Sequence, residues 1–503
     1  MLYNKVLFTT FWISLISTIA VGQTITSKIV DKKTNQPIPY ATIQVSKNEG
    51  VITNEEGRFS LNLGDNFSKT DSIYISSMGY EKVGISIQNV TDSIIYIEPK
   101  AIELKGVFIS NKNLTVDEIM ENVENNLSKN YDFKLSHKRL FFRESEFNTV
   151  KKLKVDFKKS TIKELNKKFI DSVTSIIPKK SEYYTEVLCD FYNSSEKAKL
   201  HIIKAAELYD KNNMGSMDAI SKKMETIFKD NVKPDSYLKI KSGIFGTKVQ
   251  VDSILENDKE ASAVKNEIDE QKKKEDKSNF LNNQKSGLKN ILSSLFFNKD
   301  VLSNFIHKSG RYNFELVDYT YIHDNSVYII EFSPKWRGDF KGTLYVNTQD
   351  FAILRADYEN VKPLKNFKLL GIMYQDNLYR NTIIFTKGQN NIYDLKYLEM
   401  HRGNIFGFDR PLKVIEKNKH VKGKRKQNEL SLDLEAFMSN KNKVEIVVFD
   451  SKPITETDYK NSTENKSIQP EYLSAYNPDF WKGYNIIEPN TAIKEFTAVP
   501  ETE

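Results

Sequence analysis

The side chains best suited to metal, redox or nucleophilic chemistry are scarce in this chain of 503 residues. It has one cysteine, Cys189, and six histidines. The histidines are His137, His201, His307, His323, His401 and His420. None has a glutamate three residues later or a second histidine at metal-binding spacing, and the patterns HExxH, GxSxG, GxxxxGK(S/T) and GxGxxG are absent. The sequence therefore predicts no catalytic, cofactor-binding or metal-binding residue, and an enzyme built on dispersed carboxylates stays open as an alternative.

Cys189 lies in an aromatic stretch, residues 183–192, that predicts a strand. One cysteine permits no internal disulfide, no thiolate zinc cluster and no CxxC redox pair. A reactive thiol needs a base and an electropositive setting. We therefore expect Cys189 to be a buried packing residue.

Composition and charge narrow the class of protein. Apolar residues make up 39% and charged residues 28% of the chain, which is typical of chains that bury a core. The 74 basic and 67 acidic residues are mostly interspersed, so the net charge of +7 predicts no nucleic-acid partner. At roughly 150 residues per domain, the length predicts about three domains.

Residues 1–22 have the pattern of a secretory signal peptide. One charge, Lys5, precedes a mostly apolar run, and the small residues Ala20 and Gly22 lie at −3 and −1 of a cut after Gly22. A membrane anchor needs about 20 predominantly apolar residues, whereas this run is shorter and rich in hydroxyls. We expect an exported protein with no transmembrane span after cleavage.

Residues 23–100 alternate short strands with turn residues, which predicts an all-β sandwich. Glycines in such turns supply positive φ, prolines keep the chain extended, and alternate strand residues point inward. We assign structural roles of this kind to Pro37, Asn54, Gly57, Phe59, Gly79 and Tyr80.

Three motifs in this segment, residues 31–43, 53–61 and 75–80, resemble the carboxypeptidase regulatory-like domain. In that family the domain is a transthyretin-like sandwich, attached to some zinc carboxypeptidases and, in bacterial envelopes, placed before TonB-dependent receptors and other surface proteins. The resemblance implies no peptidase activity, because the zinc ligands are missing. Weaker similarities at residues 125–131, 237–246 and 478–489 indicate an uncharacterised family of envelope proteins, either periplasmic or associated with the outer membrane.

The middle of the chain predicts a linker and a mixed helix and strand region at 101–255. Thr115 and Glu118 form a capping box that begins a helix ending near Ser128. Residues 256–310 comprise a charged insert, with 14 charged residues among the 22 of 256–277, and an amphipathic helix expected to lie on the following sheet.

Residues 311–450 predict a curved antiparallel sheet whose strands follow one another closely. Its expected strands include 381–386, 392–400, 411–416, 430–437 and 444–449. Their pattern is similar to the half-open sheets of periplasmic lipoprotein carriers, which hold acyl chains. Residues 451–503 form an aromatic strap, expected to pack across this sheet, and a tail. The fold class is α+β and multidomain: an N-terminal sandwich, a mixed middle and a C-terminal sheet.

A basic cluster surrounds the predicted hairpin tip near residue 420. It contains Lys417, Lys419, Lys422, Lys424, Arg425 and Lys426. Such a tip suits the phosphates of lipopolysaccharide or anionic lipid, and a solvated loop is the alternative.

The sequence therefore favours an exported, non-catalytic envelope protein. Its sandwich would be an interaction module, and its C-terminal sheet would bind a partner protein or an amphiphile. Two alternatives remain: a hydrolase or peptidase-like enzyme with dispersed carboxylates, and an accessory of TonB-dependent uptake, for which residues 104–110 are the sequence argument.

Overall fold

The computed structural model describes residues 24–498, except 47–48, 64–66, 69, 91–92, 101–113, 132–133, 195, 244, 252–279, 323–324, 389–390, 419, 421 and 423–424. The expected signal peptide, most of the linker and the charged insert lie outside the described residues. The chain forms two compact units: residues 1–100 with 478–490, and residues 101–477 with 491–503. We call them the sandwich unit and the sheet unit.

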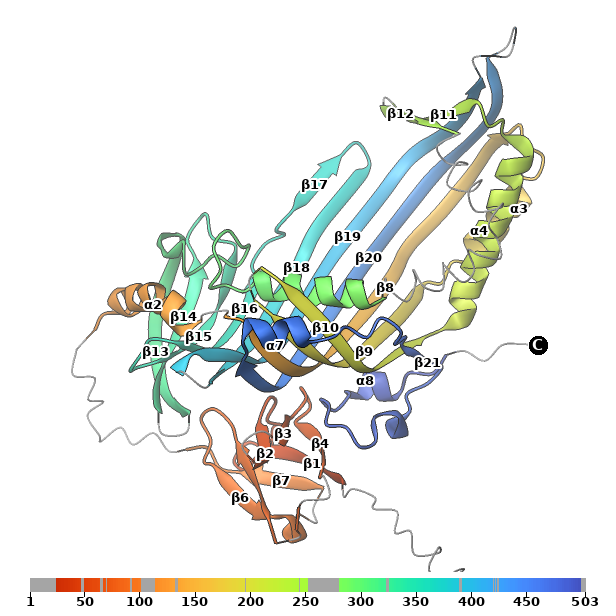
Figure 1. The fold of residues 1–503 in the computed structure, drawn as a ribbon. Helices are drawn as coiled ribbons and strands as arrows, with labels where there is room; N and C mark the ends of the chain where they lie inside the picture. Colours follow the sequence, from red (N-terminus) through yellow and green to blue (C-terminus); the bar gives the residue numbers. More distant parts are fainter. Residues whose placement is uncertain are drawn as a thin grey trace, which may run out of the picture. The chain divides into compact units, whose positions relative to one another are not determined.

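The sandwich unit contains two sheets (Figure 1). One has the order β4 (Arg58–Asn62), β1 (Thr24–Asp31), β7 (Ile94–Ile97), and the other has the order β3 (Glu49–Ile52), β2 (Thr42–Ser46), β5 (Ser72–Ser76), β6 (Val83–Ser86). A short 3-10 helix, η1 (Ile87–Asn89), follows β6. Alternate strand residues such as Ile43, Phe59 and Ile75 are fully buried in a shared apolar core. The expected all-β sandwich is confirmed.

Turn residues of the three motifs are held by local bonds. Gly57 and Gly79 have φ of +74° and +79°, which only glycine adopts readily. The Asn54 side chain accepts the backbone N–H of Glu56 at 3.0 Å and of Arg58 at 2.9 Å. These bonds close the turn that leads into β4.

Aromatic residues near the C-terminus complete the sandwich unit. Residues 478–490, which begin with the 3-10 helix η4 (Pro478–Trp481), belong to this unit, and Phe480 and Trp481 are buried. The Asn54 amide donates to the carbonyl of Pro489 at 3.3 Å. These residues of the expected strap therefore form part of the sandwich unit. Their backbone and amide groups find partners at the open edge of the sandwich.

Within the described residues, the sheet unit is built on one sheet of fourteen strands. Its main path is β13 (Tyr312–Ile322), β14 (Asn325–Pro334), β15 (Phe340–Asn347), β16 (Ile353–Asn360), β18 (Ile372–Lys387), β19 (Tyr393–Asn418), β20 (Lys426–Pro453), β8 (Ser136–Ser160), β9 (Lys180–Asn193), β10 (Ala198–Tyr209) and β21 (Glu471–Leu473). Beside this path, β17 (Asn366–Leu369) pairs with β18, and the hairpin of β11 (Ser236–Ser242) and β12 (Phe245–Gln250) pairs with β19. Neighbours are antiparallel except β10 and β21.

The strands of this sheet are longer than the sequence predicts. Segments 392–400 and 411–416 are one strand, β19, and segments 430–437 and 444–449 are one strand, β20. The polar residues between them pair across the sheet: the Asn440 amide donates to Asn148 at 2.8 Å. Because these polar side chains satisfy one another, they do not end the strands.

Helices cover one face of the sheet in the half of the long strands that contains Phe142, Leu398 and Ile446. We call this half the near half, and the half towards the β19–β20 connection the far half. α2 (Val116–Asn130) begins with the predicted capping box, and its apolar stripe packs with the helix at 280–293 into the main core. Phe142, Leu398 and Ile446 project from the strands into this core, so we call this side of the sheet the core face. Other helices among the described residues are α3 (Lys167–Ile176), α4 (Lys211–Asn231), η2 (Ser309–Arg311), α7 (Glu456–Asn461) and α8 (Thr491–Lys494).

Candidate functional site

Cys189, His137 and His401, three of the reactive side chains named from the sequence, are engaged in packing or ion pairs. Cys189 is fully buried, and burial raises the pKa of its thiol. His137 and Arg139 both bond Asp190, at 2.8 and 2.6 Å, and these contacts outweigh burial and lower the pKa of Asp190 to about 2. Within the described ranges, which omit His323, no group of three His, Cys, Asp or Glu side chains could hold a metal ion.

A buried ionic network lies on the face opposite the core face. Arg143 donates to Glu186 at 2.7 Å and lies 3.6 Å from Glu445, while Lys443 lies 3.3 Å from Glu399. Burial opposes ionisation of Glu399, but His401 and Lys443 outweigh it and lower the pKa of Glu399 to about 2. Each of these carboxylates lies beside a cation. The network therefore consists of ion pairs that link neighbouring strands.

The far half of the core face is apolar across five strands. Strand register aligns Phe367, Tyr374, Phe406, Met438 and Val150 in one row. The next row contains Leu369, Ile372, Phe408, Ala436 and Leu153. Further rows add Leu434 with Val155, in which β19 contributes Arg410, and Leu412 with Leu432 and Phe157. We call these four rows the distal apolar face.

Two bulges keep the apolar side chains of β8 on the distal apolar face. β20 alternates without interruption between Leu430 and Val448, whereas β8 has an extra residue at Lys151 and again at Lys158. Each bulge reverses the alternation of β8, so Val150, before the first bulge, and Leu153, after it, project to the same side.

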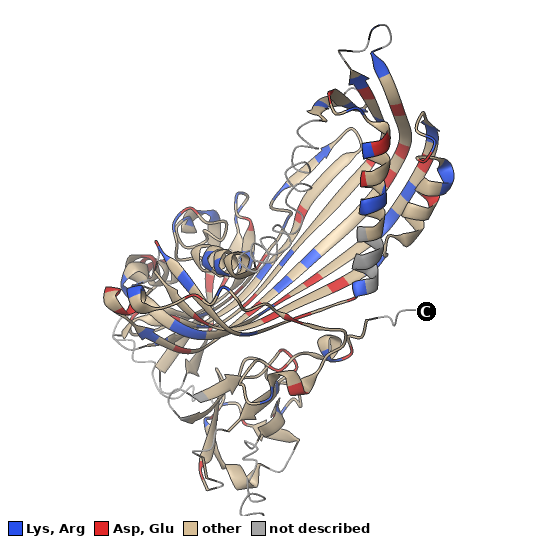
Figure 2. Ribbon diagram, turned by 45° about the vertical axis from the view of Figure 1, so that its right-hand side comes forward, with Lys and Arg blue, Asp and Glu red and all other residues tan. Residues whose placement is uncertain are grey.

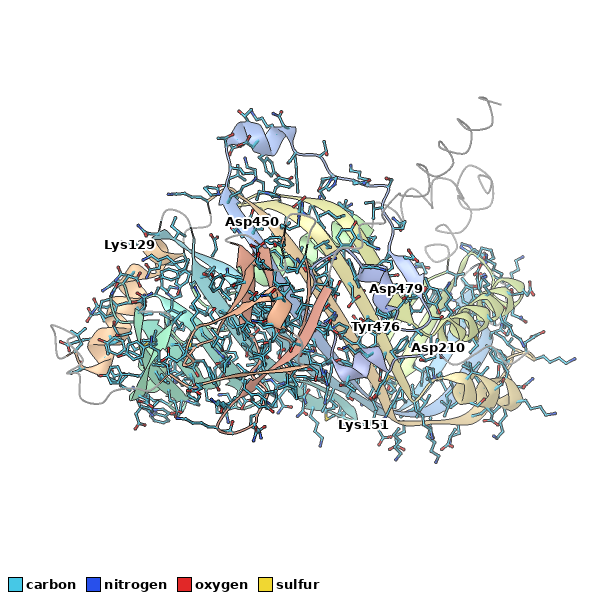
Figure 3. The ribbon with its side chains drawn as sticks, turned by 90° about the horizontal axis from the view of Figure 1, so that it is seen from below. Lys129, Lys151, Asp210, Asp450, Tyr476 and Asp479 are labelled. Atoms are coloured by element: carbon cyan, nitrogen blue, oxygen red, sulfur yellow. The ribbon has the colours of Figure 1, made fainter. Side chains whose placement is uncertain are left out.

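Charged pairs occupy the reverse side of the same strands. Lys152 lies beside Glu435, and Lys158 lies 2.9 Å from Asp433. Lys151, labelled in Figure 3, is exposed. A cavity of about 410 Å³ on this side includes Lys151, Lys152 and Lys368 in its lining. This half of the sheet therefore has one mainly apolar side and one side on which charged pairs lie among apolar residues such as Met373 and Phe437.

Two helices flank the distal apolar face. Figure 1 shows α3 and α4 beside the far half of β8, on the other side of the long strands from β17. The end of α4 packs Ile227 and Phe228 into a small cluster that reaches Leu430 on the core face. On these helices Met224 is 38% and Ile176 40% exposed. On the face itself Phe406 is 39% exposed.

The predicted basic cluster lies where β19 and β20 meet. Lys417 pairs with Lys426 across the two strands, Lys422 and Arg425 lie in the connection, and Lys419 and Lys424 lie outside the described residues. Lys426 is ion-paired with Glu429.

Glu429, which is 3% exposed, also lies 3.0 Å from Lys413 and 3.2 Å from Lys159. Part of this positive charge is therefore compensated within the protein.

The alternation of residues 430–437 predicts a strand with one apolar side, but sequence reasoning did not single out the distal apolar face as a whole. The signal was the period-two spacing of Phe406 and Phe408 on β19 and of Ile372 and Tyr374 on β18. Gly403 and Asn404 obscured it by resembling a turn. The register between the strands, which cannot be read from the sequence, places these short patterns side by side.

These features define an α+β protein with an N-terminal sandwich, a large antiparallel sheet and an apolar face as its candidate binding site. Residues 25–109 match the family model of the CarboxypepD_reg-like domain, which confirms the resemblance of the front segment. No curated protein and no solved structure matches the chain. Among the described residues, no helix is long and apolar enough to cross a membrane.

Proposed function

We propose that this protein is an exported, non-catalytic envelope protein whose distal apolar face binds the acyl chains of an anionic amphiphile. The observation that carries the proposal is the continuity of the apolar rows across β17, β18, β19, β20 and β8. Export is supported by the signal-peptide pattern of residues 1–22 and by the sandwich domain.

The size of the face suits an acyl chain. Five neighbouring strands span about 19 Å at their usual spacing. A lipid chain occupies about half of a hydrocarbon core that is about 30 Å thick, so one row can accommodate a whole chain. Each methylene group removed from water contributes about 0.8 kcal/mol, and Phe406 and its neighbours offer partly exposed apolar surface for this contact.

Positive charge next to the face suits an anionic headgroup. The β11–β12 hairpin extends the sheet beside β19 and carries Lys239, Lys241 and Lys248 with no acidic residue in 236–250. Lys417, Lys422 and Arg425 lie at the far end of the same strands. Figure 2 shows basic residues at these strand ends, and both basic and acidic residues along α4. A phosphate or carboxylate headgroup could pair there while its chains lie on the apolar rows.

Binding of a fluorescent long-chain fatty acid to delipidated full-length mature protein tests the proposal. Phe406 and Met438 face each other on the distal apolar face, and their neighbours Ile405 and Ser439 face each other on the reverse side. We expect Phe406→Glu with Met438→Glu to weaken binding by at least about tenfold, because charge replaces apolar contact. Ile405→Glu with Ser439→Glu is the matched control and should bind like wild type.

Competition by phosphatidylglycerol should displace the probe if an anionic lipid is the ligand class. The proposal is wrong if wild type does not bind the fatty acid. It is also wrong if the two glutamate pairs weaken binding equally, since binding would then not depend on the apolar side.

A further inference from the structure

Two hairpin tips of the sheet unit expose large apolar side chains. At the β17–β18 tip, Phe367 is 48%, Leu369 47% and Leu370 54% exposed. At the β11–β12 tip, Phe245 is 40% exposed. Four such side chains on two neighbouring hairpins form an unusual surface, because exposed apolar residues are ordinarily scattered singly.

Arg410 of β19 joins the two tips. Its guanidinium donates to the carbonyl of Leu370, to the hydroxyl of Ser242 at 2.7 Å and to the carbonyl of Ser242 at 2.6 Å. It also lies 4.9 Å from the centre of the Phe245 ring. Arg410 is 8% exposed, so this link is built into the fold. The tips are therefore held together as one surface.

The turn between β17 and β18 presents leucine at a strained position. Leu370 and Gly371 have φ of +45° and +79°, the signs required at both central positions of a type I′ turn. Asparagine and glycine are the residues that favour this turn, whereas leucine is disfavoured at positive φ. Strain of this kind concentrates at functional sites. An exposed apolar side chain is thus placed at the outermost position of the hairpin against the backbone preference.

The charged residues in the paired segments of the two hairpins are all basic. Lys368 lies within residues 366–375, which contain no acidic residue, and Lys241 and Lys248 lie on the other hairpin, which also has none. Lys368 and Lys248 are exposed. Apolar side chains that insert beneath headgroups, combined with lysines that meet the phosphates, are the features that bind a protein to an anionic bilayer.

We propose that the paired tips of the β17–β18 and β11–β12 hairpins dock on the surface of a bilayer that carries anionic headgroups. This inference goes beyond the proposed function, because an amphiphile can bind the distal apolar face in solution without any docking of the tips. Docking would place the open end of the apolar rows, where Phe367 and Leu369 lie, next to the lipid.

Sedimentation of the full-length mature protein with vesicles tests docking. We expect binding to vesicles of equal parts phosphatidylcholine and phosphatidylglycerol, and weaker binding to pure phosphatidylcholine. Phe245→Ser with Leu370→Asn should reduce partition by about tenfold, because two inserted side chains are lost. Lys248→Glu with Lys368→Glu should reduce it by about fivefold for each lysine. Leu370→Asn alone suits the turn, so a loss of binding in that variant cannot be attributed to misfolding.

Trp336 provides the control. It is 97% exposed between Lys335 and Arg337, outside both hairpins, and Trp336→Ser should leave vesicle binding unchanged. The inference is wrong if wild type does not sediment with anionic vesicles, if the hairpin variants bind like wild type, or if Trp336→Ser abolishes binding. Because fatty-acid binding is measured without vesicles, failure of the proposed function and failure of docking are distinguishable.

Discussion

The side-chain amide of Asn485 bonds both backbone groups of Asn62. The backbone N–H of Asn62 donates to the amide oxygen at 2.7 Å, and the amide nitrogen donates to the Asn62 carbonyl at 3.3 Å. Asn62 ends β4, an edge strand of the sandwich. The amide thus supplies the pairing that a neighbouring strand would give. If the sandwich is an interaction module, this part of its edge is already occupied by its own chain.

Replacing Asn485 tests this role. We expect Asn485→Ala to lower the free energy of unfolding of the sandwich unit by about 1–2 kcal/mol, because two backbone groups lose their partner. Urea unfolding followed by Trp481 fluorescence measures it in a chain that begins at residue 23 and carries Trp336→Phe, where Trp481 is the only tryptophan. The exposed neighbour Lys482 gives the control, and Lys482→Ala should change little. An equal effect of both substitutions would contradict the role of Asn485.

The buried ionic network makes a second prediction. Arg143 and Glu186 are 1% and 2% exposed, and removal of one partner leaves the other charge buried. Arg143→Ala should therefore destabilise the sheet unit by about 3–5 kcal/mol. Arg139 pairs with Asp190 on the same strands but is 45% exposed, so Arg139→Ala should cost less than about 1 kcal/mol. Urea unfolding followed by far-ultraviolet circular dichroism compares the two variants. Similar losses of unfolding free energy would show that the buried network stabilises the sheet unit no more than a half-exposed ion pair does.

A third prediction concerns acid. The pKa of Glu399 falls from 4.5 to about 2 on folding, so its ionised form stabilises the sheet unit by about 3 kcal/mol above pH 4.5. This contribution is lost as the pH falls from about 4.5 towards 2, because the unfolded chain takes up the proton first. The stability difference between wild type and Glu399→Gln should shrink over that interval. Denaturant midpoints measured from about pH 6 to about pH 1.5, a range that brackets both pKa values, would contradict the prediction if the difference stayed constant.

The elements that the sequence predicted best are those whose signals are local. The local geometry of the capping box of Thr115 and Glu118, and of the turns at Gly57 and Gly79, depends on residues that are close together in the sequence. The distal apolar face was missed because it depends on register between strands far apart in the chain, as in the pairing of Met438 with Val150. The partner of the sandwich edge was missed for the same reason, since 423 residues separate Asn62 from Asn485.

Leu370 allows the strain at the β17–β18 turn to be measured as stability. A non-glycine residue in the left-handed region costs about 1–2 kcal/mol, and asparagine tolerates it best. Leu370→Asn should therefore raise the free energy of unfolding of the sheet unit by about 1 kcal/mol, read from the urea midpoint. Its neighbour Leu369 is equally exposed but has no positive φ, so Leu369→Asn should give no gain. If Leu370→Asn is no more stable than wild type, the turn stores no strain, and the argument that leucine is placed there against the backbone preference fails.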